Sequence, residues 1–379
     1  MKSQTIDVVT AGHICVDISP RFEGHTSGRQ LEKIFRPGAL TVVGPAVLSS
    51  GGGVANVGLS ALRMGLNVAL MGKCGKDLLG EALLSLLRSA SPECARGMRV
   101  TAGETTSYSV VLAPPGTDRF FLHCPGANDT FVADDIDLEM VSRARLFYFG
   151  YPPLMARMYQ GKGEELARVL AGVKGRGVTT ALDMALPDPA GAGGQADWPA
   201  ILAGALPHVD LFVPSVEEVT FMLRRDEYDR LVGRGDILDA LTPPLLRELS
   251  ERCLKLGPAV VMIKCGRHGL YLRSAPRKRI EAMGSAAPKD PAAWAGRELF
   301  APSYQVPRVI SALGAGDSAV AGLLCGLLHG ADVKTAADYA CAAGAQNVQV
   351  IDATSGIRHW DVTTRELSHP RVQPVVTLD

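Results

Sequence analysis

The chain has 379 residues, 47% of them hydrophobic and 21% charged, so it can bury a sizeable core, which excludes a mainly disordered protein. Its 39 basic and 39 acidic residues give a formal net charge of +0, which argues against nucleic acid or an acidic membrane as a partner. No apolar run approaches the roughly 20 residues of a membrane span, and Asp7 interrupts the segment where a signal peptide would need its apolar core. None of the eight cysteines forms a Cys-x-x-Cys pair, so a zinc site lacks support and we expect free thiols in a reducing cytoplasm.

Short apolar runs alternate with helical patterns along the chain. Strands are predicted at residues 6–12, 66–72, 146–149, 178–182, 211–213 and 259–263, and helices at 54–64 and 77–90. Such alternation is typical of an α/β protein with a mostly parallel central sheet that helices cover on both faces.

Two segments depart from this alternation. Residues 18–50 are polar and Gly-rich, with a strand-like piece at 40–43. Residues 105–123 alternate between apolar and polar side chains around Pro114, which predicts a hairpin. Two further insertions, at 225–244 and 275–297, look like surface additions without chemistry of their own.

A glycine turn opens the apolar helix pattern near the C-terminus, in the run Ser311-Ala-Leu-Gly-Ala-Gly-Asp317. Gly314 and Gly316 allow close approach of the backbone to a ligand, and the first amides of the helix point outward at the positive end of its dipole. This combination predicts an anion site, usually for phosphate, built from Gly314, Ala315 and Gly316. Asp317 at its mouth would repel phosphate, but it suits a base that deprotonates a hydroxyl attacking that phosphate.

Other interpretations of this turn compete. Gly314-x-Gly316-x-x-Ala319 also fits a dinucleotide fingerprint, but too little chain follows it for the two halves of that fold. A helix start that needs glycine only for packing stays open on this motif alone.

A second glycine element lies near the other end of the chain, in Gly51-Gly-Gly-Val-Ala-Asn56, and continues into Gly72-Lys-Cys-Gly-Lys-Asp-Leu-Leu-Gly80. Together with the Gly-Ala-Gly-Asp element, this pair of signatures resembles the ribokinase-like (PfkB) family of sugar and nucleoside kinases. The resemblance implies one domain over 1–379, a three-layer α/β/α fold with a mostly parallel sheet, and a small β-sheet lid from about 18–50 and 105–123. It also implies phosphoryl transfer from ATP with Mg²⁺ to a hydroxymethyl group of a sugar or polyol, with a possible homodimer through the lid.

Acceptor-binding residues are expected at the carboxyl ends of the parallel strands. Asp17 follows the first strand and can accept two hydroxyl hydrogen bonds, although it could also be a cap. In the family, this Asp, the glycines at 51–53 and the Asn at 56 meet the sugar; a tight turn and a helix cap are the alternatives. Tyr151 stands near the place where ribokinases tend to carry Glu, so it either contacts the acceptor or merely packs beside two prolines. Ribokinases also carry Lys where Gly53 stands, which makes ribose less certain.

Donor-side residues follow from the same resemblance. Lys264, Gly266 and Gly269 match the turn that meets the nucleotide, with Lys264 either on the triphosphate or solvated. Asn347 is the candidate contact to adenine. Glu218 keeps the place of a Glu that acts through hydrated magnesium, but Ser215 replaces the family's Asn, and a first-turn Glu behind a Ser cap is the structural alternative.

Residues 311–313 depart from the family pattern. Ser311, Ala312 and Leu313 stand where many members have an Asp, a Thr and a polar residue that contribute to a monovalent-cation site, so weak potassium dependence is expected. These departures keep two alternatives open: a nucleoside kinase of the same fold, and a sugar-binding regulatory protein that has lost turnover.

Overall fold

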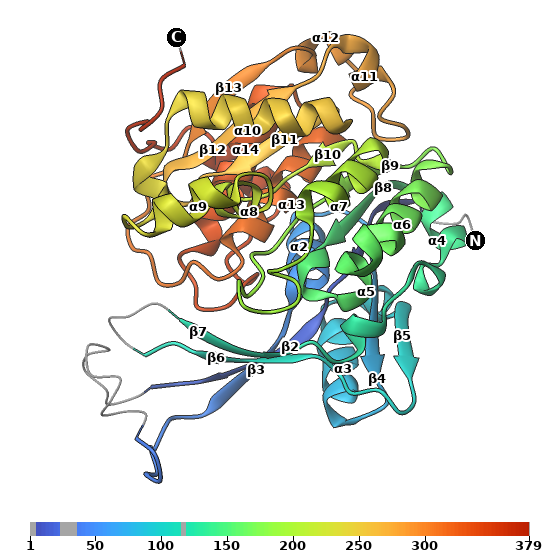
Figure 1. The fold of residues 1–379 in the computed structure, drawn as a ribbon, viewed down its shortest axis with the longest axis vertical. Coiled ribbons are helices and arrows are strands. Elements are labelled where there is room, and N and C mark those ends of the chain that lie inside the picture. Colours follow the sequence, from blue (N-terminus) through green and yellow to red (C-terminus); the bar gives the residue numbers. More distant parts are fainter. Residues whose placement is uncertain (1–4, 23–35, 115–118, 379) are drawn as a thin grey trace.

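A twisted nine-stranded sheet runs through the molecule in the order β13-β12-β11-β10-β9-β8-β1-β4-β5 (Figure 1). The structure is a computed structural model that describes residues 5–22, 36–114 and 119–378. The strands of this sheet are β1 (Ile6–Gly12), β4 (Val68–Gly75), β5 (Gly97–Thr101), β8 (Ala144–Gly150), β9 (Thr179–Leu182), β10 (Leu211–Phe212), β11 (Val260–Lys264), β12 (Gly269–Ser274) and β13 (Glu298–Pro302). All neighbours from β5 to β11 pair in parallel, and only β12 and β13 are added antiparallel at one edge.

Helices cover both faces of the sheet and make the outer layers. They are α2 (Gly52–Arg63), α3 (Leu78–Ala90), α4 (Leu138–Ser142), α5 (Ala156–Tyr159), α6 (Glu164–Lys174), α7 (Trp198–Ala205), α8 (Val216–Leu223), α9 (Arg225–Val232), α10 (Pro243–Leu256), α11 (Arg277–Glu281), α12 (Pro291–Trp294), α13 (Ala315–Leu328), α14 (Val333–Asn347) and α15 (Trp360–Glu366). One apolar core lies between the sheet and α2, α13 and α14, and a second lies between the opposite face and α6, α7 and α10. The three-layer α/β/α architecture is therefore confirmed.

Burial on both faces explains the composition of the strands. Every residue of β4 and β9 is buried. β4 begins with the apolar run Val-Ala-Leu-Met, as expected of a parallel strand between two helical layers, whereas β9 also buries two threonines. The predicted strands and helices of this part of the chain are confirmed, with shifts of a few residues at their ends.

A separate four-stranded sheet forms the lid and projects from the main body (Figure 1). Its order is β3-β2-β6-β7, with β2 (Cys15–Pro20), β3 (Ala46–Gly51), β6 (Tyr108–Leu112) and β7 (Phe120–Cys124). The hairpin prediction is confirmed, because β6 and β7 pair antiparallel, whereas its turn at 115–118 and part of the first lid segment, 23–35, lie outside the described residues.

The strand-like piece at 40–43 is a wrong prediction. Residues 36–45 form no strand, and β3 begins only at Ala46. The exposed fraction is 92% for Leu40 and 76% for Val42, so this segment buries little apolar surface that would favour a strand.

Within the described ranges, no helix combines the length and apolar character that crossing a membrane requires.

Candidate active site

The residues that follow the parallel strands lie at one edge of the sheet, and the site forms there. His13 follows β1, Tyr151 follows β8, Asp183 follows β9, and Lys264 ends β11. Helix α13 places Asp317 at the same edge in its first turn. The edge beyond the carboxyl ends of parallel strands is the usual place for a ligand in this class of sheet.

The glycine turn before α13 has the conformation that the sequence predicts. Gly314 caps the helix at φ 72°, a left-handed conformation that favours glycine. A Cβ atom on Gly314 would also lie 2.6 Å from the Cβ atom of Ala353. The amide of Ala315 donates to the Ala312 carbonyl at 3.3 Å, so the first-turn amides of Gly316 and Asp317 are the better candidates for holding an anion.

Asp317 is held from both sides by residues far away in the sequence. Its side chain is buried, with Oδ2 accepting from Nδ2 of Asn56 at 2.9 Å and Oδ1 accepting from the Tyr151 hydroxyl at 2.6 Å. Burial raises the pKa of Asp317, while the hydrogen bond from Tyr151, the charge of Lys264 and the hydrogen bond from Asn56 oppose the rise. A carboxylate with a raised pKa is better matched to proton abstraction near neutral pH than an exposed one.

Tyr151 is the other unusual backbone position of the site. It adopts a left-handed conformation with φ 64° although it carries a side chain. Such strain persists where the surroundings determine it, and here the hydroxyl is committed to Asp317. Burial raises the pKa of Tyr151, so the phenol stays protonated and donates. The hydroxyl of Tyr151 thus contacts the predicted base, while a contact of Tyr151 with the acceptor stays a prediction.

The glycines at 51–53 give other side chains access to the start of α2. A Cβ atom on Gly51 would overlap the carboxylate of Asp17, and one on Gly53 would lie 2.9 Å from the Tyr148 hydroxyl. A Cβ atom on Gly52 would lie 2.6 Å from Nδ1 of His13. The glycine run therefore brings Asp17 and the two aromatic rings against the helix N-terminus, where the family places the sugar.

Asp17 does not stand at the end of the first strand, because β1 ends at Gly12 and a second strand, β2 of the lid, begins at Cys15. It is a buried carboxylate on β2, with an exposed fraction of 6%. Burial raises its pKa to about 6, partly opposed by hydrogen bonds from Cys15 and Ser109 and reinforced by the negative charge of Asp317. The electrostatic coupling of Asp17 with Asp317 indicates that the predicted acceptor residue and the predicted base share one site.

Lys264 forms a buried ion pair that the sequence did not reveal. Its Nζ atom lies 2.6 Å from Oδ1 of Asp183, which is fully buried at the end of β9. Burial alone would lower the pKa of Lys264, but the Asp183 carboxylate raises it above its ordinary value, so the ammonium is retained. Nζ lies 3.8 Å from the position that a Cβ atom of Gly316 would occupy, which places this charge beside the predicted phosphate turn.

Glu218 fits the capping alternative. Ser215 Oγ accepts from the Glu218 amide at 3.2 Å and Glu218 Oε2 accepts from the Ser215 amide at 2.6 Å, forming a capping box at the start of α8. Glu218 also lines the main cavity, and among the described residues no group of three or more His, Cys, Asp or Glu side chains could hold a metal ion. Mg²⁺ held by phosphate oxygens and waters, with Glu218 behind one of those waters, suits this donor set, and that role stays a prediction.

A cavity of about 950 Å³ joins these groups into one site. Its polar end contains Tyr151, Glu218, Lys264 and Asp317. The rest of its wall comes from the predicted nucleotide turn, the segment before α13 and helix α14, including Gly266, Gly269, Leu270, Tyr304, Val306, Val309, Ala340, Gly344 and Val348. The cavity joins the predicted phosphate turn to the predicted nucleotide turn, and its volume lies in the range of small-molecule sites, so this is where the resemblance predicts the nucleotide.

Asn347 does not line this cavity. It is fully buried in α14, and its Nδ2 atom donates to the Leu313 carbonyl at 2.5 Å. This bond supports the turn before α13, whereas Oδ1 of Asn347 is buried without a hydrogen-bond partner among the described residues, and the adenine contact stays a prediction.

Sequence reasoning missed four residues of the site: His13, Tyr148, Asp183 and His123. Asp183 and His13 could have been found, because each follows a predicted strand at its carboxyl end. His123 could not, because its approach to His13 depends on how the lid folds over the main sheet.

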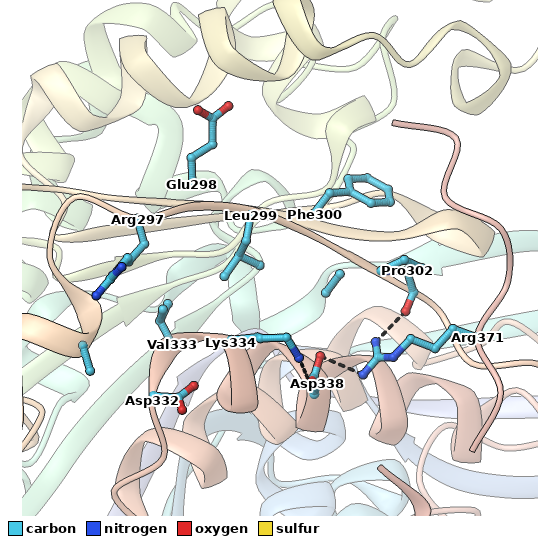
Figure 2. Close-up of a pocket in the computed structure, with 12 residues that line it drawn as sticks. Arg297, Glu298, Leu299, Phe300, Pro302, Asp332, Val333, Lys334, Asp338 and Arg371 are labelled. Atoms are coloured by element: carbon cyan, nitrogen blue, oxygen red, sulfur yellow. Dashed lines mark hydrogen bonds and ion pairs between the residues drawn. The ribbon is translucent and has the colours of Figure 1, made fainter. Parts of the chain in front are cut away.

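A second cavity, of about 520 Å³, lies between β13, the start of α14 and Arg371 (Figure 2). Its charged groups satisfy one another: Asp338 lies 2.9 Å from Nζ of Lys334 and 2.7 Å from Nη2 of Arg371. Arg371 also donates to the Pro302 carbonyl at 2.8 Å. None of the residues that line this cavity belongs to the predicted site.

The sheet order, the lid and the glycine turn beneath Asp317 together define a kinase fold of the ribokinase type. Residues 6–360 match the pfkB family of carbohydrate kinases, and the chain belongs to this family.

Known proteins of this kind are similar to parts of the sequence and to the whole fold. Fructokinase-1 of Zea mays is 32% identical over 114 residues, covering 30% of this chain and 35% of that protein. Probable fructokinase-6, chloroplastic, of Arabidopsis thaliana is 27% identical over 212 residues, covering 54% of this chain and 52% of that protein. The matched segments thus span about a third to a half of the length of these relatives.

Solved structures extend the likeness to nearly the full chain. The Arabidopsis thaliana ribokinase complexed with ribose and ATP has a TM-score of 0.67 at 18% identity and covers 96% of this chain and 99% of its own. Ribokinase from Thermotoga maritima has a TM-score of 0.68 at 17% identity, with coverage of 96% and 100%. A putative ribokinase II from E. coli in complex with ATP and Mg²⁺ has a TM-score of 0.66 at 19% identity, with coverage of 95% and 98%. At these identities the likeness shows the fold.

Proposed function

We propose that the protein transfers the γ-phosphoryl group of ATP to a hydroxymethyl group of a sugar, with Asp317 as the general base. The observation that carries this proposal is the position of Asp317. It lines the main cavity beside the predicted phosphate turn, and two residues expected to bind the sugar, Asn56 and Tyr151, hold both of its oxygens. A carboxylate at the mouth of an anion-binding turn serves an attacking hydroxyl rather than the phosphate itself.

The reaction follows from the placement of the chain's own groups. The acceptor hydroxyl donates its proton to Asp317 while its oxygen forms a bond to the γ-phosphorus, and the bond to the β–γ bridging oxygen breaks. The amides of Gly316 and Asp317 and the ammonium of Lys264 lie where the transferred charge develops, and groups oriented in advance stabilise such charge efficiently. Mg²⁺, when bound, would neutralise charge on the β- and γ-phosphates.

The acceptor is expected to be a neutral sugar. Asp17 and Asn56 supply a carboxylate and an amide that suit hydroxyl groups. Because relatives named fructokinase and ribokinase resemble this chain, D-fructose and D-ribose are the first acceptors to test, with adenosine as the representative nucleoside.

The eight cysteines are free thiols, which fits the expected reducing cytoplasm.

The test combines an acceptor panel with one variant. Purified protein with ATP and Mg²⁺ should phosphorylate at least one sugar of a panel of pentoses, hexoses and sugar acids. Asp317→Asn should lower kcat by about 10²–10⁴ while an ATP analogue still binds with unchanged affinity in calorimetric titration. Asp361→Asn, at an exposed position of α15, is the matched control and should behave as wild type. Turnover by Asp317→Asn within a few-fold of wild type would show that Asp317 is not the base.

A further inference from the structure

Two histidines, the buried His13 and the partly exposed His123, join the lid to the main sheet at the acceptor side of the site. His13 follows β1, His123 lies on β7 of the lid, and their Nε2 atoms are 3.2 Å apart. The exposed fraction of His13 is 2%. Burial, nearly complete for His13 and partial for His123, lowers the pKa of both rings, so each is a neutral imidazole with one N–H. One Nε2 atom must therefore donate to the other.

The direction of that hydrogen bond follows from the rest of the chain of contacts. His123 Nδ1 lies 3.0 Å from Ser109 Oγ. Ser109 on β6 is the direct partner of Asp17 on the neighbouring strand β2, and from there its hydroxyl stabilises the carboxylate of Asp17. A hydroxyl has a single proton, so Ser109 can donate to Asp17 only if it accepts from His123. His123 then carries its proton on Nδ1, and its bare Nε2 atom accepts from His13.

Because the neutral ring of His13 donates through Nε2, its Nδ1 atom carries no proton. The same Nδ1 atom is buried and has no hydrogen-bond partner among the described residues. It lies against Gly52 at the start of α2, and the ring of His13 stands 6.0 Å from the ring of Tyr151, centroid to centroid. A buried acceptor without a partner is unfavourable and calls for an explanation.

We propose that His13 is an acceptor-binding residue whose bare Nδ1 atom accepts a hydrogen bond from a hydroxyl of the sugar. His123 and Ser109 are positioning residues, because they fix the tautomer that leaves Nδ1 bare and orient Asp17 at the other end of the chain. The inference rests on the proposed sugar kinase activity. It makes recognition of the acceptor depend on a lid residue, so a sugar is bound fully only when β7 lies over the main sheet.

The tautomers can be observed without any substrate. In long-range ¹H–¹⁵N spectra of protein labelled in the imidazole rings, His13 should carry its proton on Nε2 and His123 on Nδ1, assigned by the loss of signals in His13→Gln and His123→Gln. Ser109→Ala should abolish the preference of His123, whereas Ser107→Ala should preserve it, because the Ser107 hydroxyl donates only to the Cys124 carbonyl at 2.8 Å. The opposite tautomers in the wild type would overturn the proposal.

Kinetics with D-fructose or D-ribose, whichever is turned over faster, test the contact itself. Gln at position 13 can keep an amide donor toward His123 but has no acceptor at the place of Nδ1, so His13→Gln should raise the KM for the sugar by about five- to tenfold. The KM for ATP should not change. Asn at this position can present its amide oxygen near the place of Nδ1, so His13→Asn should restore part of the sugar affinity.

Monodeoxy analogues of the same sugar identify the hydroxyl. For one analogue, the KM of wild type and of His13→Gln should become equal, because both then lack the same hydrogen bond. An equal penalty for His13→Gln across all analogues would overturn the contact. Absence of turnover with every sugar would reject the proposed function instead, and the imidazole spectra would still decide the tautomers.

Discussion

At the scale of single residues, the surroundings of Asp317 determine its pKa and therefore the pH dependence of the reaction. The hydrogen bond from the Tyr151 hydroxyl to Oδ1 stabilises the ionised form, so its removal should raise the pKa of Asp317 further. Because the base must be ionised to act, the acid limb of the kcat–pH profile of Tyr151→Phe should move to higher pH by about one unit. Profiles from pH 5 to pH 9 measure this.

The control for that shift is Tyr339→Phe. The Tyr339 hydroxyl pairs with Thr364 between α14 and α15 and does not contact Asp317. Its profile should coincide with the wild type, and coincidence of the Tyr151→Phe profile as well would mean that the hydrogen bond does not influence the base.

Asp17 links acceptor binding to stability. Its pKa of about 6 in the folded protein exceeds that of an ordinary aspartate, so folding is favoured below the unfolded value and loses this stabilisation as pH rises through about 6. Asp17→Asn cannot ionise, so its Tm relative to wild type should increase between pH 4 and pH 7.5. The same variant should raise the KM for the sugar and leave ATP binding unchanged. A Tm difference independent of pH would contradict the buried, titrating carboxylate.

The sequence alone could predict several residues of the site, but not their contacts with one another. Asp317, Asn56 and Tyr151 were all predicted, but as separate contributors; that Asn56 and Tyr151 bind the carboxylate of Asp317 required the fold. Lys264 was left between two interpretations because its partner Asp183 lies 81 positions away in the chain. Local patterns identify a strand end or a helix start, and they do not say which of those ends face one another.

At the scale of elements, the turn before α13 is constrained both by its backbone conformation and by the packing around it. Gly314 requires a left-handed φ of 72°, and a side chain there would meet Ala353 in the loop that follows α14. Gly314→Ala should therefore destabilise the protein by about 1–2 kcal/mol and should lower kcat, since the amides of the turn move. Thermal unfolding and initial rates measure the two effects.

Gly204→Ala is the matched control for that substitution. Gly204 lies within α7, and a Cβ atom there would meet nothing within 4 Å. Alanine in an open helical position should stabilise the fold by about 0.5–1 kcal/mol. If Gly314→Ala changes the free energy of unfolding by no more than Gly204→Ala does, the turn tolerates a side chain.

The strand elements were predictable because burial on both faces leaves apolar runs, as at the start of β4 and in β11. Leu40 and Val42 gave the same local signal, but both side chains are largely exposed, and the prediction failed there. An apolar run indicates a strand only if the tertiary structure buries it.

The segment at 311–313 should make the reaction only weakly dependent on monovalent cations. Ser311 offers a neutral hydroxyl, which accepts from the Leu313 amide at 3.1 Å and from Nη1 of Arg119 at 3.4 Å. A guanidinium beside a site without a carboxylate disfavours a second cation. Initial rates in potassium, sodium and a bulky organic cation at fixed ionic strength and magnesium should agree, and activation by potassium of about tenfold or more would show that other oxygens replace the carboxylate.

At the scale of the whole molecule, the lid sheet exposes apolar side chains that a second copy of the chain could cover. The exposed fraction is 42% for Phe120, 50% for Phe121 and 60% for Leu122, and all three lie on β7, an edge strand of the lid sheet. Consecutive exposed apolar residues on an edge strand are typical of interaction surfaces. We therefore predict a homodimer through the lid, which would also bring a second lid close to each acceptor site.

Sedimentation velocity at micromolar protein concentration tests the dimer. The wild type should sediment as a dimer, and Leu122→Asp should shift it to a monomer, because burying an unpaired carboxylate in an apolar interface is unfavourable by several kcal/mol. Val232→Asp provides the control, since Val232 is an exposed apolar residue of comparable exposure, 47%, on α9 and away from the lid. If Val232→Asp dissociates the dimer and Leu122→Asp does not, the subunits meet elsewhere. A monomeric wild type at concentrations far above those of the kinetic assays would mean that the lid acts alone over its own acceptor site.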